Sequence, residues 1–404
     1  MRVAWNTLAL AGAFLSCASI ATAQGPLTLT EALSRVRERA PQIISARLAI
    51  EESRARLLGA SHLQSNPEAD LGLGTRQGRG ARSTDLDLGL DQSFEPGRRR
   101  SARRAMATAG IDQRTAELAE VTRLVLAETA FAFLRTVYLQ DRIRLIDRNE
   151  ALAGSVLQIA DRRFRAGDIP ILDVNIARAA LARVRADRQR AMAERASVLG
   201  ELQTLLQTEG DVQVQGGLPR PQEPDATALL QAASGRPELR ALEAGIREAD
   251  AEAQFGQSFR RPDYGFGVRY QREEGDHILF GGLTLTLPMF SKGQEPIALG
   301  LARASRLKAE LEALRIRARI EVLASLSAHQ SRLEVVRLLE TEALPGLDDN
   351  DTLATRSYEV GQLGLAELIL IRREILDTRF EYLEALLEAA LARVQLDARA
   401  GVLR

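Results

Sequence analysis

The sequence contains few of the residues on which catalytic, metal-binding and disulfide-bonded proteins depend. Its 404 residues include one cysteine and three histidines, and only 4% of them are aromatic. A lone cysteine, Cys17, can form no disulfide within the chain. The histidines, His62, His277 and His329, are far apart, and none has a second histidine, cysteine or acid at ligand spacing. We therefore expect no metal site.

Catalytic and phosphate-binding motifs are missing as well. There is no Gly-x-Ser-x-Gly elbow, and Gly72, Gly74 and Gly78 are not followed by the helix start and lysine that a phosphate loop requires. Lysine and arginine number 54, as do aspartate and glutamate, so no net charge attracts nucleic acid. These absences predict a protein that is not an enzyme, uses no cofactor and binds no nucleic acid.

The N-terminus has the pattern of a secretory signal peptide. Arg2 precedes an apolar run over residues 8–20, and Ala21-Thr22-Ala23 supplies a small-x-small cleavage site. The run is too short to remain as a membrane anchor, so we expect residues 1–23 to be removed. The alternative is a lipoprotein signal in which Cys17 is lipidated, which would change only the anchoring.

The mature sequence contains the same structural unit twice in succession. In each copy a long Ala/Leu/Arg-rich run ends at a glycine, Gly167 or Gly361, and an acidic residue follows six positions later. Other residues repeat at nearly the same offset: Pro41 with Pro237, Pro67 with Pro262, Phe94 with Phe290, and Gly97 with Gly293. The pattern predicts two repeats, 24–209 and 237–404, joined by a Pro/Gly-rich linker over 210–236.

Helical periodicity dominates both copies. Thr28 or Thr30 can cap a first helix that continues past Pro41 to about Gln64. The run from 98 to 165 has no proline, and at ~1.5 Å per residue it predicts one helix of about 100 Å, typical of a coiled coil or a barrel stave. The equivalent run, 297–360, contains Pro345-Gly346, where we expect a kink. Return helices are predicted over 171–207 and 365–404.

After the first helix of each copy, the apolar period changes from helical to alternating. Apolar residues alternate with glycine, acids or other polar residues over four segments: 71–75, 86–91, 264–271 and 283–287. Each copy therefore predicts a hairpin whose strands, about nine or ten residues long, match a tilted bilayer span. The expected fold class is mainly α with a small β part, an internally duplicated helical hairpin unit with four strands per chain.

Two interpretations of the strand hairpins stay open. They form a half-buried sheet on a soluble domain, as in a periplasmic coiled-coil scaffold, or they lie in a membrane. The signal peptide, the lack of another segment to bury the apolar faces and the aromatics of the second hairpin favour the membrane. Four strands cannot close a barrel and lipid does not tolerate open edges, so this interpretation predicts an oligomer that pools its hairpins.

Two charged features also have two interpretations each. Asp173 and Glu367 lie early in predicted helices, where the helix dipole favours acids; alternatively, symmetry arranges them in a ring that selects cations or closes a pore. The arginine-rich run 98–104 is either a solvated helix face or a contact with anionic lipid headgroups at a barrel rim.

The order helix, strand hairpin, long helix, glycine turn and return helix, repeated twice behind a signal peptide, resembles the TolC-type outer membrane factor family. This family serves tripartite efflux and type I secretion systems. The resemblance covers the mature chain, and its most specific parts are residues 27–33 followed by Ala40-Pro41, and the two glycine turns. The segment 94–99, Phe-Glu-Pro-Gly-Arg-Arg, is similar to the Glu-x-Gly-x-Arg element of the heavy-metal efflux (CzcC-like) branch.

The resemblance implies a homotrimer in which three chains build a twelve-stranded outer membrane barrel, continuous with a helical barrel in the periplasm. The implied partners are a periplasmic adaptor (membrane fusion protein), an RND-type inner-membrane transporter and outer membrane lipid. The adaptor would contact the turns at Ala166, Gly167, Asp168, Val360, Gly361 and Gln362. Asp173, Tyr358 and Glu367 would close the entrance, although Leu363 and Leu370 stand where the family can have a basic residue and a second acid.

The expected function is therefore the outer membrane channel of a tripartite efflux system, an exit duct for metal cations or small toxic compounds chosen by the pump. The alternatives are a type I protein-secretion duct and the periplasmic scaffold mentioned above.

Overall fold

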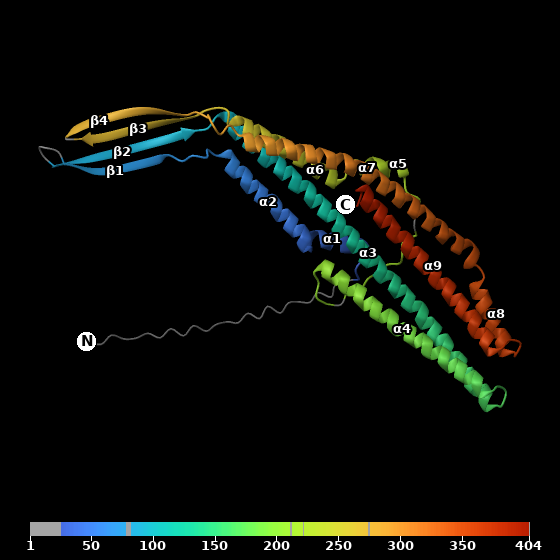
Figure 1. Cartoon of the computed structure of the whole chain (residues 1–404). Coiled ribbons are helices and arrows are strands. Elements are labelled where there is room, and N and C mark those ends of the chain that lie inside the picture. The colour runs from blue at the N-terminus through green and yellow to red at the C-terminus, as the bar shows by residue number, and fades with distance from the viewer. Residues whose placement is uncertain (1–25, 78–81, 211, 221, 274, 404) are drawn as a thin grey trace, which may run out of the picture.

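The chain forms an elongated molecule with a strand sheet at one end and two helical turns at the other (Figure 1). The computed structural model describes residues 26–77, 82–210, 212–220, 222–273 and 275–403. The expected signal peptide and Cys17 lie outside the described residues. The expected fold class is confirmed: the chain is mainly helical, with one four-stranded antiparallel sheet.

The N-terminal helical run is divided into two helices. α1 spans Leu29–Arg39, and its first turn has the capping box in which the Thr28 side chain and Glu31 satisfy each other's backbone N–H groups. α2 spans Pro41–Ser61. The prediction of one continuous helix to Gln64 was wrong, because a proline disfavours the helical conformation of the residue before it, and Ala40 is extended.

The first helical hairpin consists of α3 (Gly97–Arg165) and α4 (Ile171–Leu206). α3 is 69 residues long and unbroken, as the absence of proline predicted. The second repeat begins with α6 (Pro237–Ser258). Its long helical run, which we call a stave as for α3, is divided into α7 (Gln294–Leu338), a π-helix (Leu339–Ala343) and α8 (Leu347–Glu359). The expected break at Pro345-Gly346 is confirmed, and α9 (Leu365–Ala400) returns.

The segment between the repeats has more structure than its proline and glycine content predicts. α5 (Ala226–Ala233) lies within it, capped by the Asp225 carboxylate, which accepts from the N–H groups of Thr227 and Ala228. Leu229 of α5 is buried in a cluster with residues of α7 and α9. Apolar packing onto the second repeat therefore overrides the turn-forming composition around this helix.

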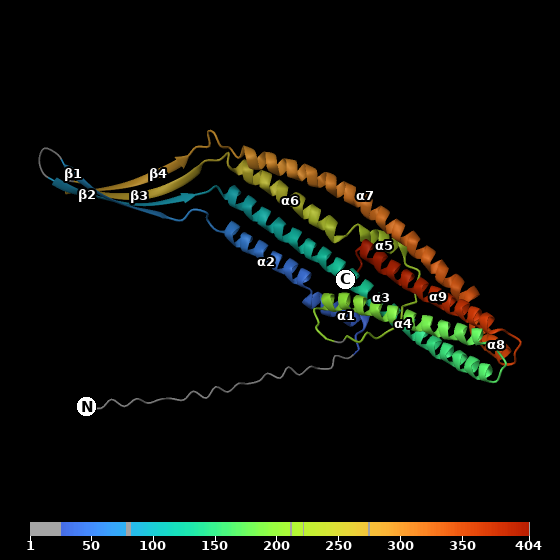
Figure 2. The same cartoon turned by 60° about the horizontal axis from the view of Figure 1, so that its bottom comes forward.

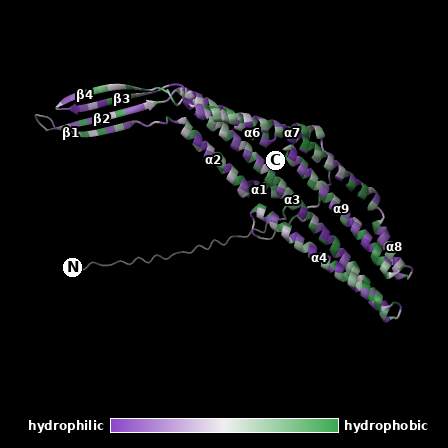
Figure 3. Cartoon of the chain, viewed as in Figure 1, coloured by the Kyte–Doolittle hydropathy of each residue, from purple (hydrophilic) through white to green (hydrophobic). Residues whose placement is uncertain are grey.

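The strands are β1 (Glu68–Gln77), β2 (Arg82–Phe94), β3 (Asp263–Glu273) and β4 (Asp276–Thr286), hydrogen-bonded in the order β1-β2-β3-β4. All neighbours are antiparallel, and β2 pairs with β3, so the two repeats share one sheet. β1 and β4 are its edges. The alternating residues of the sequence are visible along every strand in Figure 3.

The helices below the sheet lie side by side in the same order as the strands that continue them: α2, α3, α6 and α7 (Figures 1 and 2). α6 and α7 approach closely at Gly300, where an added Cβ atom would lie 2.6 Å from the backbone nitrogen of Ala253. Farther from the sheet, α4 and α9 both pack against α3, and α9 also packs against α7. Each chain is thus a single layer of helices and strands with two open edges.

Candidate functional site

The turns that end the two helical hairpins have the same backbone geometry. Gly167 and Gly361 have φ angles of +82° and +77°, in the left-handed region that glycine adopts without strain. The N–H of Asp168 donates to the carbonyl oxygen of Arg163 at 2.9 Å, and the N–H of Gln362 donates to that of Ser357 at 2.8 Å. Both turns are Schellman-type helix ends, so the duplication extends to individual hydrogen bonds.

Both turns lie at the end of the molecule opposite the sheet (Figure 1). We call residues 166–168 the first tip and residues 360–362 the second tip. All six residues are exposed, including the apolar Val360. The tips are therefore accessible to another protein along the long axis of the chain.

Directly behind the tips, the two hairpins pack against each other through one apolar cluster. Its buried members come from α3, α4, α8 and α9: Val156, Ala160, Val174, Ala177, Ala354, Tyr358, Leu365 and Leu368. This cluster holds the two tips at a fixed separation within one chain.

Tyr358 lies inside this cluster and is only 2% exposed. The guanidinium group of Arg163, from the first hairpin, lies 5.4 Å from the centroid of its ring, and Nη1 of Arg163 lies 3.5 Å from its carbonyl oxygen. The Tyr358 hydroxyl is buried without a hydrogen-bond partner among the described residues. Sequence reasoning missed Arg163, which its position three residues before the first tip does not distinguish from other arginines.

The two acidic residues near the tips have different surroundings. Glu367 accepts a hydrogen bond from the backbone N–H of Gly364 at 3.0 Å and so caps α9. Its counterpart Asp173 lies in the first turn of α4 behind Pro170, which has no N–H to donate. In the described residues, the side chains of Asp173, Tyr358 and Glu367 form no hydrogen bond with one another. One chain therefore does not assemble the three predicted gate residues into a cluster.

The apolar face of the sheet is uncovered. Leu71 and Leu283, on the two edge strands, are 68% and 67% exposed. Most apolar residues of β2 and β3 on this face are exposed too: Leu88, Leu90, Tyr264, Phe266 and Val268. None of the described helices packs on this face (Figures 1 and 2). The opposite face carries Asp70, Asp87 and Arg269, with Arg269 within 3.8 Å of both carboxylates. One face thus suits an apolar environment and the other suits water.

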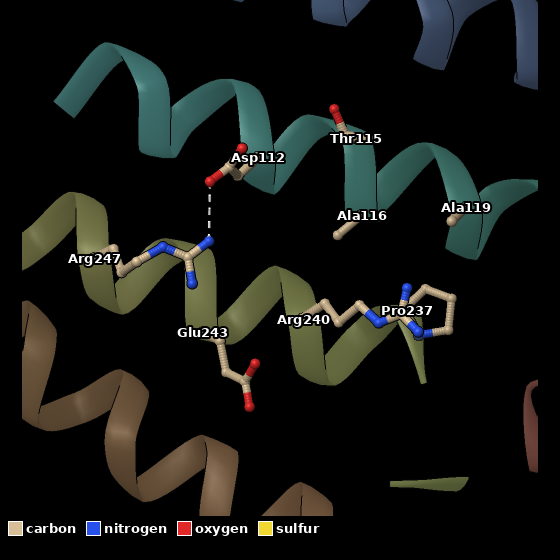
Figure 4. Close-up of a pocket in the computed structure, with 8 residues that line it drawn as sticks. All are labelled: Asp112, Thr115, Ala116, Ala119, Pro237, Arg240, Glu243 and Arg247. Atoms are coloured by element: carbon tan, nitrogen blue, oxygen red, sulfur yellow. Dashed lines mark hydrogen bonds and ion pairs between the residues drawn. The ribbon is translucent and has the colours of Figure 1, made fainter. Parts of the chain in front are cut away.

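The hollow shown in Figure 4 has a volume of about 400 Å³ and lies between α3 and α6, where Arg247 donates to Asp112 at 3.0 Å. In the described part of the chain, no group of histidine, cysteine, aspartate or glutamate side chains is placed to hold a metal ion. None of the described helices has the length and apolar content needed to cross a membrane.

Comparison with known proteins gives concordant results. The family model for outer membrane efflux proteins matches residues 32–208. The cobalt-zinc-cadmium resistance protein CzcC of Cupriavidus metallidurans is 25% identical over 387 residues, which cover 93% of this chain and 90% of CzcC.

Two solved structures are similar over nearly the whole chain, each with a TM-score of 0.75 and 18% identity. A crystal structure of CusC is matched over 92% of this chain and 91% of CusC. The open state of the MtrE outer membrane channel of Neisseria gonorrhoeae is matched over 93% of this chain and 89% of MtrE.

The fold is that of outer membrane channel proteins. Residues 32–208 match the outer membrane efflux protein family, as the repeat pattern and turn motifs indicated. The matching family and the fold are those of channel proteins.

Proposed function

We propose that three copies of this chain form a passive exit duct through the outer membrane, with the helices extending into the periplasm. Each chain would contribute two repeats, 24–209 and 237–404, joined by residues 210–236. The observation that carries the proposal is the single layer with two open edges and one exposed apolar sheet face.

The sheet supports this proposal because neither of its edges is satisfied within one chain. An open strand edge is not tolerated in lipid, so β4 of one subunit has to pair with β1 of the next. Three such pairings close a twelve-stranded barrel with the leucine-rich face toward lipid and the Asp70 and Arg269 face toward water.

The edge helices support the same closure. α2 exposes Leu48 and Leu58, and α7 exposes Ile316 and Ile320. Since α2 and α7 lie at opposite edges of the layer, a head-to-tail ring would bury both apolar sets at one repeated interface.

The two tips are the proposed docking site of a periplasmic adaptor that connects the duct to an RND-type inner-membrane transporter. Their exposure and their position at the end farthest from the sheet support this assignment. The gate role of Asp173, Tyr358 and Glu367 also remains a proposal. Tyr358 would act by holding the hairpins together, while Asp173 and Glu367 would meet their symmetry copies in the trimer.

Metal cations are the proposed cargo, since the similar CzcC is named for resistance to cobalt, zinc and cadmium. The pump would choose the cargo and the duct would conduct it. A strain that lacks the gene should become sensitive to these metals and recover when the gene is restored. Unchanged metal tolerance with increased sensitivity to organic toxicants would replace metals by small toxic compounds.

The membrane assignment is tested by one substitution on each face of β1. Leu71→Arg places a charge on the proposed lipid face, at a cost of about 2–4 kcal/mol near the bilayer midplane. Gly74→Arg is the matched control on the opposite face, where an added Cβ meets nothing within 4 Å. We expect Leu71→Arg to reduce the amount of outer membrane trimer and the control to retain it. Equal amounts in both variants, or a soluble wild-type protein, would support the scaffold alternative.

The tip assignment is tested by cross-linking to the adaptor in cells. Gln362→Trp adds bulk to an exposed tip residue and should abolish adaptor cross-linking while the trimer persists. Glu209→Trp, in an exposed loop away from the tips, serves as control and should cross-link normally. Normal cross-linking of both variants would remove the docking role from the second tip.

A further inference from the structure

The chain passes four times between the helices and the sheet, and three of these passages meet the first two turns of α3. The passages run from α2 to β1, from β2 to α3, from α6 to β3 and from β4 to α7. The arginines of the sequence run 98–104 are not equivalent here. Arg99, Arg100 and Arg103 contact the passages, whereas Arg98 and Arg104 are exposed, and their side chains make no hydrogen bond or ion pair with any described residue.

Arg103 joins two passages. Its Nη2 donates to Oε1 of Glu95 at 2.6 Å and its Nη1 donates to Oε2, so the planar guanidinium group binds the carboxylate with both arms. Both side chains are largely buried. The same Nη2 donates to the carbonyl oxygen of His62 at 3.2 Å, and Arg100 donates to the carbonyl oxygen of Ser61. These two carbonyl groups end α2, whereas Glu95 follows β2.

Arg99 reaches the third passage. Its Nη1 donates to Oδ2 of Asp263, the first residue of β3, at 2.8 Å. Its guanidinium group also lies over the ring of Phe259, at the end of α6, 4.3 Å from the centroid. The buried Arg99 is therefore fixed both to the strand and to the helix that precedes it.

The fourth passage needs no arginine, because its backbone rests directly on α6. A Cβ atom on Gly293, at the start of α7, would lie 2.0 Å from the carbonyl oxygen of Gly256. Glycine at both positions permits this contact. All four passages are thus anchored to α3 or α6, the two central helices of the layer.

We propose that Arg99, Arg100 and Arg103 are positioning residues that fix the orientation of the sheet on the helices. This inference rests on the proposed trimeric duct: β1 of one subunit can meet β4 of the next only if each sheet leaves its helices at the same angle. The sequence motif over 94–99 would then be a junction between the membrane barrel and the helical barrel. For Arg99, Arg100 and Arg103, this role replaces both interpretations of the arginine-rich run 98–104, the solvated helix face and the contact with lipid headgroups.

The test compares arginines of α3 that contact the passages with arginines of the same helix that do not. Arg103→Ala should reduce the amount of detergent-stable outer membrane trimer about tenfold, because removing one partner leaves the buried Glu95 charge unpaired. Arg98→Ala and Arg104→Ala should match the wild type. The exchange of Glu95→Arg with Arg103→Glu should recover part of the trimers, because it restores the ion pair but not the bond to the His62 carbonyl oxygen. Wild-type amounts of trimer for Arg103→Ala, or no recovery in the exchange, would overturn the proposal.

A second readout separates positioning from general stability. Spin labels on the exposed Leu73 of β1 and Ala105 of α3 report the distance between sheet and helices in the purified trimer, with Cys17 replaced by serine. We expect the trimers that Arg103→Ala still forms to give a broader distance distribution than Arg104→Ala. Distance distributions of equal width in the two variants would contradict a positioning role. If the wild-type protein itself forms no trimer in the membrane, that result contradicts the proposed function and not the positioning role alone.

Discussion

The two helical hairpins follow the same plan, but their long staves differ in continuity. In the first hairpin, α3 runs without interruption to Arg165. In the second, a five-residue π-helix and Gly346, at φ +85°, separate α7 from α8. π-helices and glycines outside the helical conformation are points at which helices bend. The duplication therefore provides one stiff hairpin and one with a built-in break.

Side chains on α9 compensate for this break. Arg372 donates to Asp351 at 3.0 Å and to Thr355 at 2.9 Å, and Tyr382 donates to Glu340 of the π-helix at 2.6 Å. Arg178, the counterpart of Arg372 at the 194-residue offset, is exposed and pairs with no described residue. Contacts from α9 thus hold the residues on both sides of the break. In the first hairpin, α4 pairs with α3 at other positions, Arg185 with Glu150 and Arg188 with Asp147. This difference can be tested by paired substitutions in the two repeats.

The largest effect is expected at Tyr358, whose counterpart in the first repeat is Phe164. Tyr358 is 2% exposed and Phe164 is 40% exposed, although both precede a tip glycine by three residues. Tyr358→Ala should lower the free energy of unfolding by about 3–5 kcal/mol, because it leaves a cavity between the hairpins. Phe164→Ala should cost less than about 1 kcal/mol. Thermal unfolding of the purified protein, followed by circular dichroism, measures both, and equal losses would contradict the comparison.

The next effect concerns the bracing of α8. Arg372→Ala should destabilise the protein by about 2 kcal/mol, since it leaves Asp351 and Thr355 without their charged partner in a partly buried site. Arg178→Ala should change the stability by less than about 0.5 kcal/mol. Hydrogen exchange of the α8 amides would show whether the loss is local. Unchanged protection of α8 in Arg372→Ala would show that this arginine does not brace it.

Two glycine substitutions should have opposite signs. Gly346 has φ +85°, so Gly346→Ala should cost about 1 kcal/mol. Gly154 of α3, which lies 192 residues before Gly346, is helical and has open space around its Cβ direction, so Gly154→Ala should stabilise by about 0.5–1 kcal/mol. Unfolding midpoints of the two variants measure this difference. A stabilising Gly346→Ala would mean that the break is not a conformational requirement.

The smallest effect is a change in titration at high pH. Burial, followed by the hydrogen bond to Glu340, raises the pKa of Tyr382 to about 12. A group with a raised folded pKa contributes stability below its unfolded pKa of about 10 and loses it as the pH rises through 12. Absorbance at 295 nm should show a late-titrating tyrosine that Tyr382→Phe removes, while Tyr138, whose pKa is also raised by burial, is present in both proteins. An unchanged titration curve would show that Tyr382 does not interact with Glu340.

The helices and strands followed closely from the sequence where local signals agree with packing. The proline-free run became α3, and the alternating leucines became strands whose apolar face no helix covers. The sequence failed at Ala40, where one proline ends a helix despite continuous periodicity, and at α5, where burial of Leu229 overrides a turn-rich composition. At both positions the outcome depends on the balance between local conformational preference and packing, which residue type alone does not reveal.

Less of the candidate site could be predicted. The tip glycines were found because a left-handed backbone needs them, and the repeat marks their position twice. The contacts of Arg163 with Tyr358 and of Arg99 with Asp263 join residues far apart in the sequence. In a chain whose basic residues are nearly all arginine, no local signal separates an engaged arginine from a solvated one.

The most direct test of the account is the pairing of β1 with β4 between neighbouring subunits. Cysteines at Gly74 of β1 and Thr284 of β4, which share the water-facing side of the sheet, are treated in the outer membrane with a short bifunctional maleimide and report which edges meet. The account predicts linked species of two and three chains and none larger. Monomers alone, or a ladder that continues beyond three chains, would contradict the closed trimeric duct.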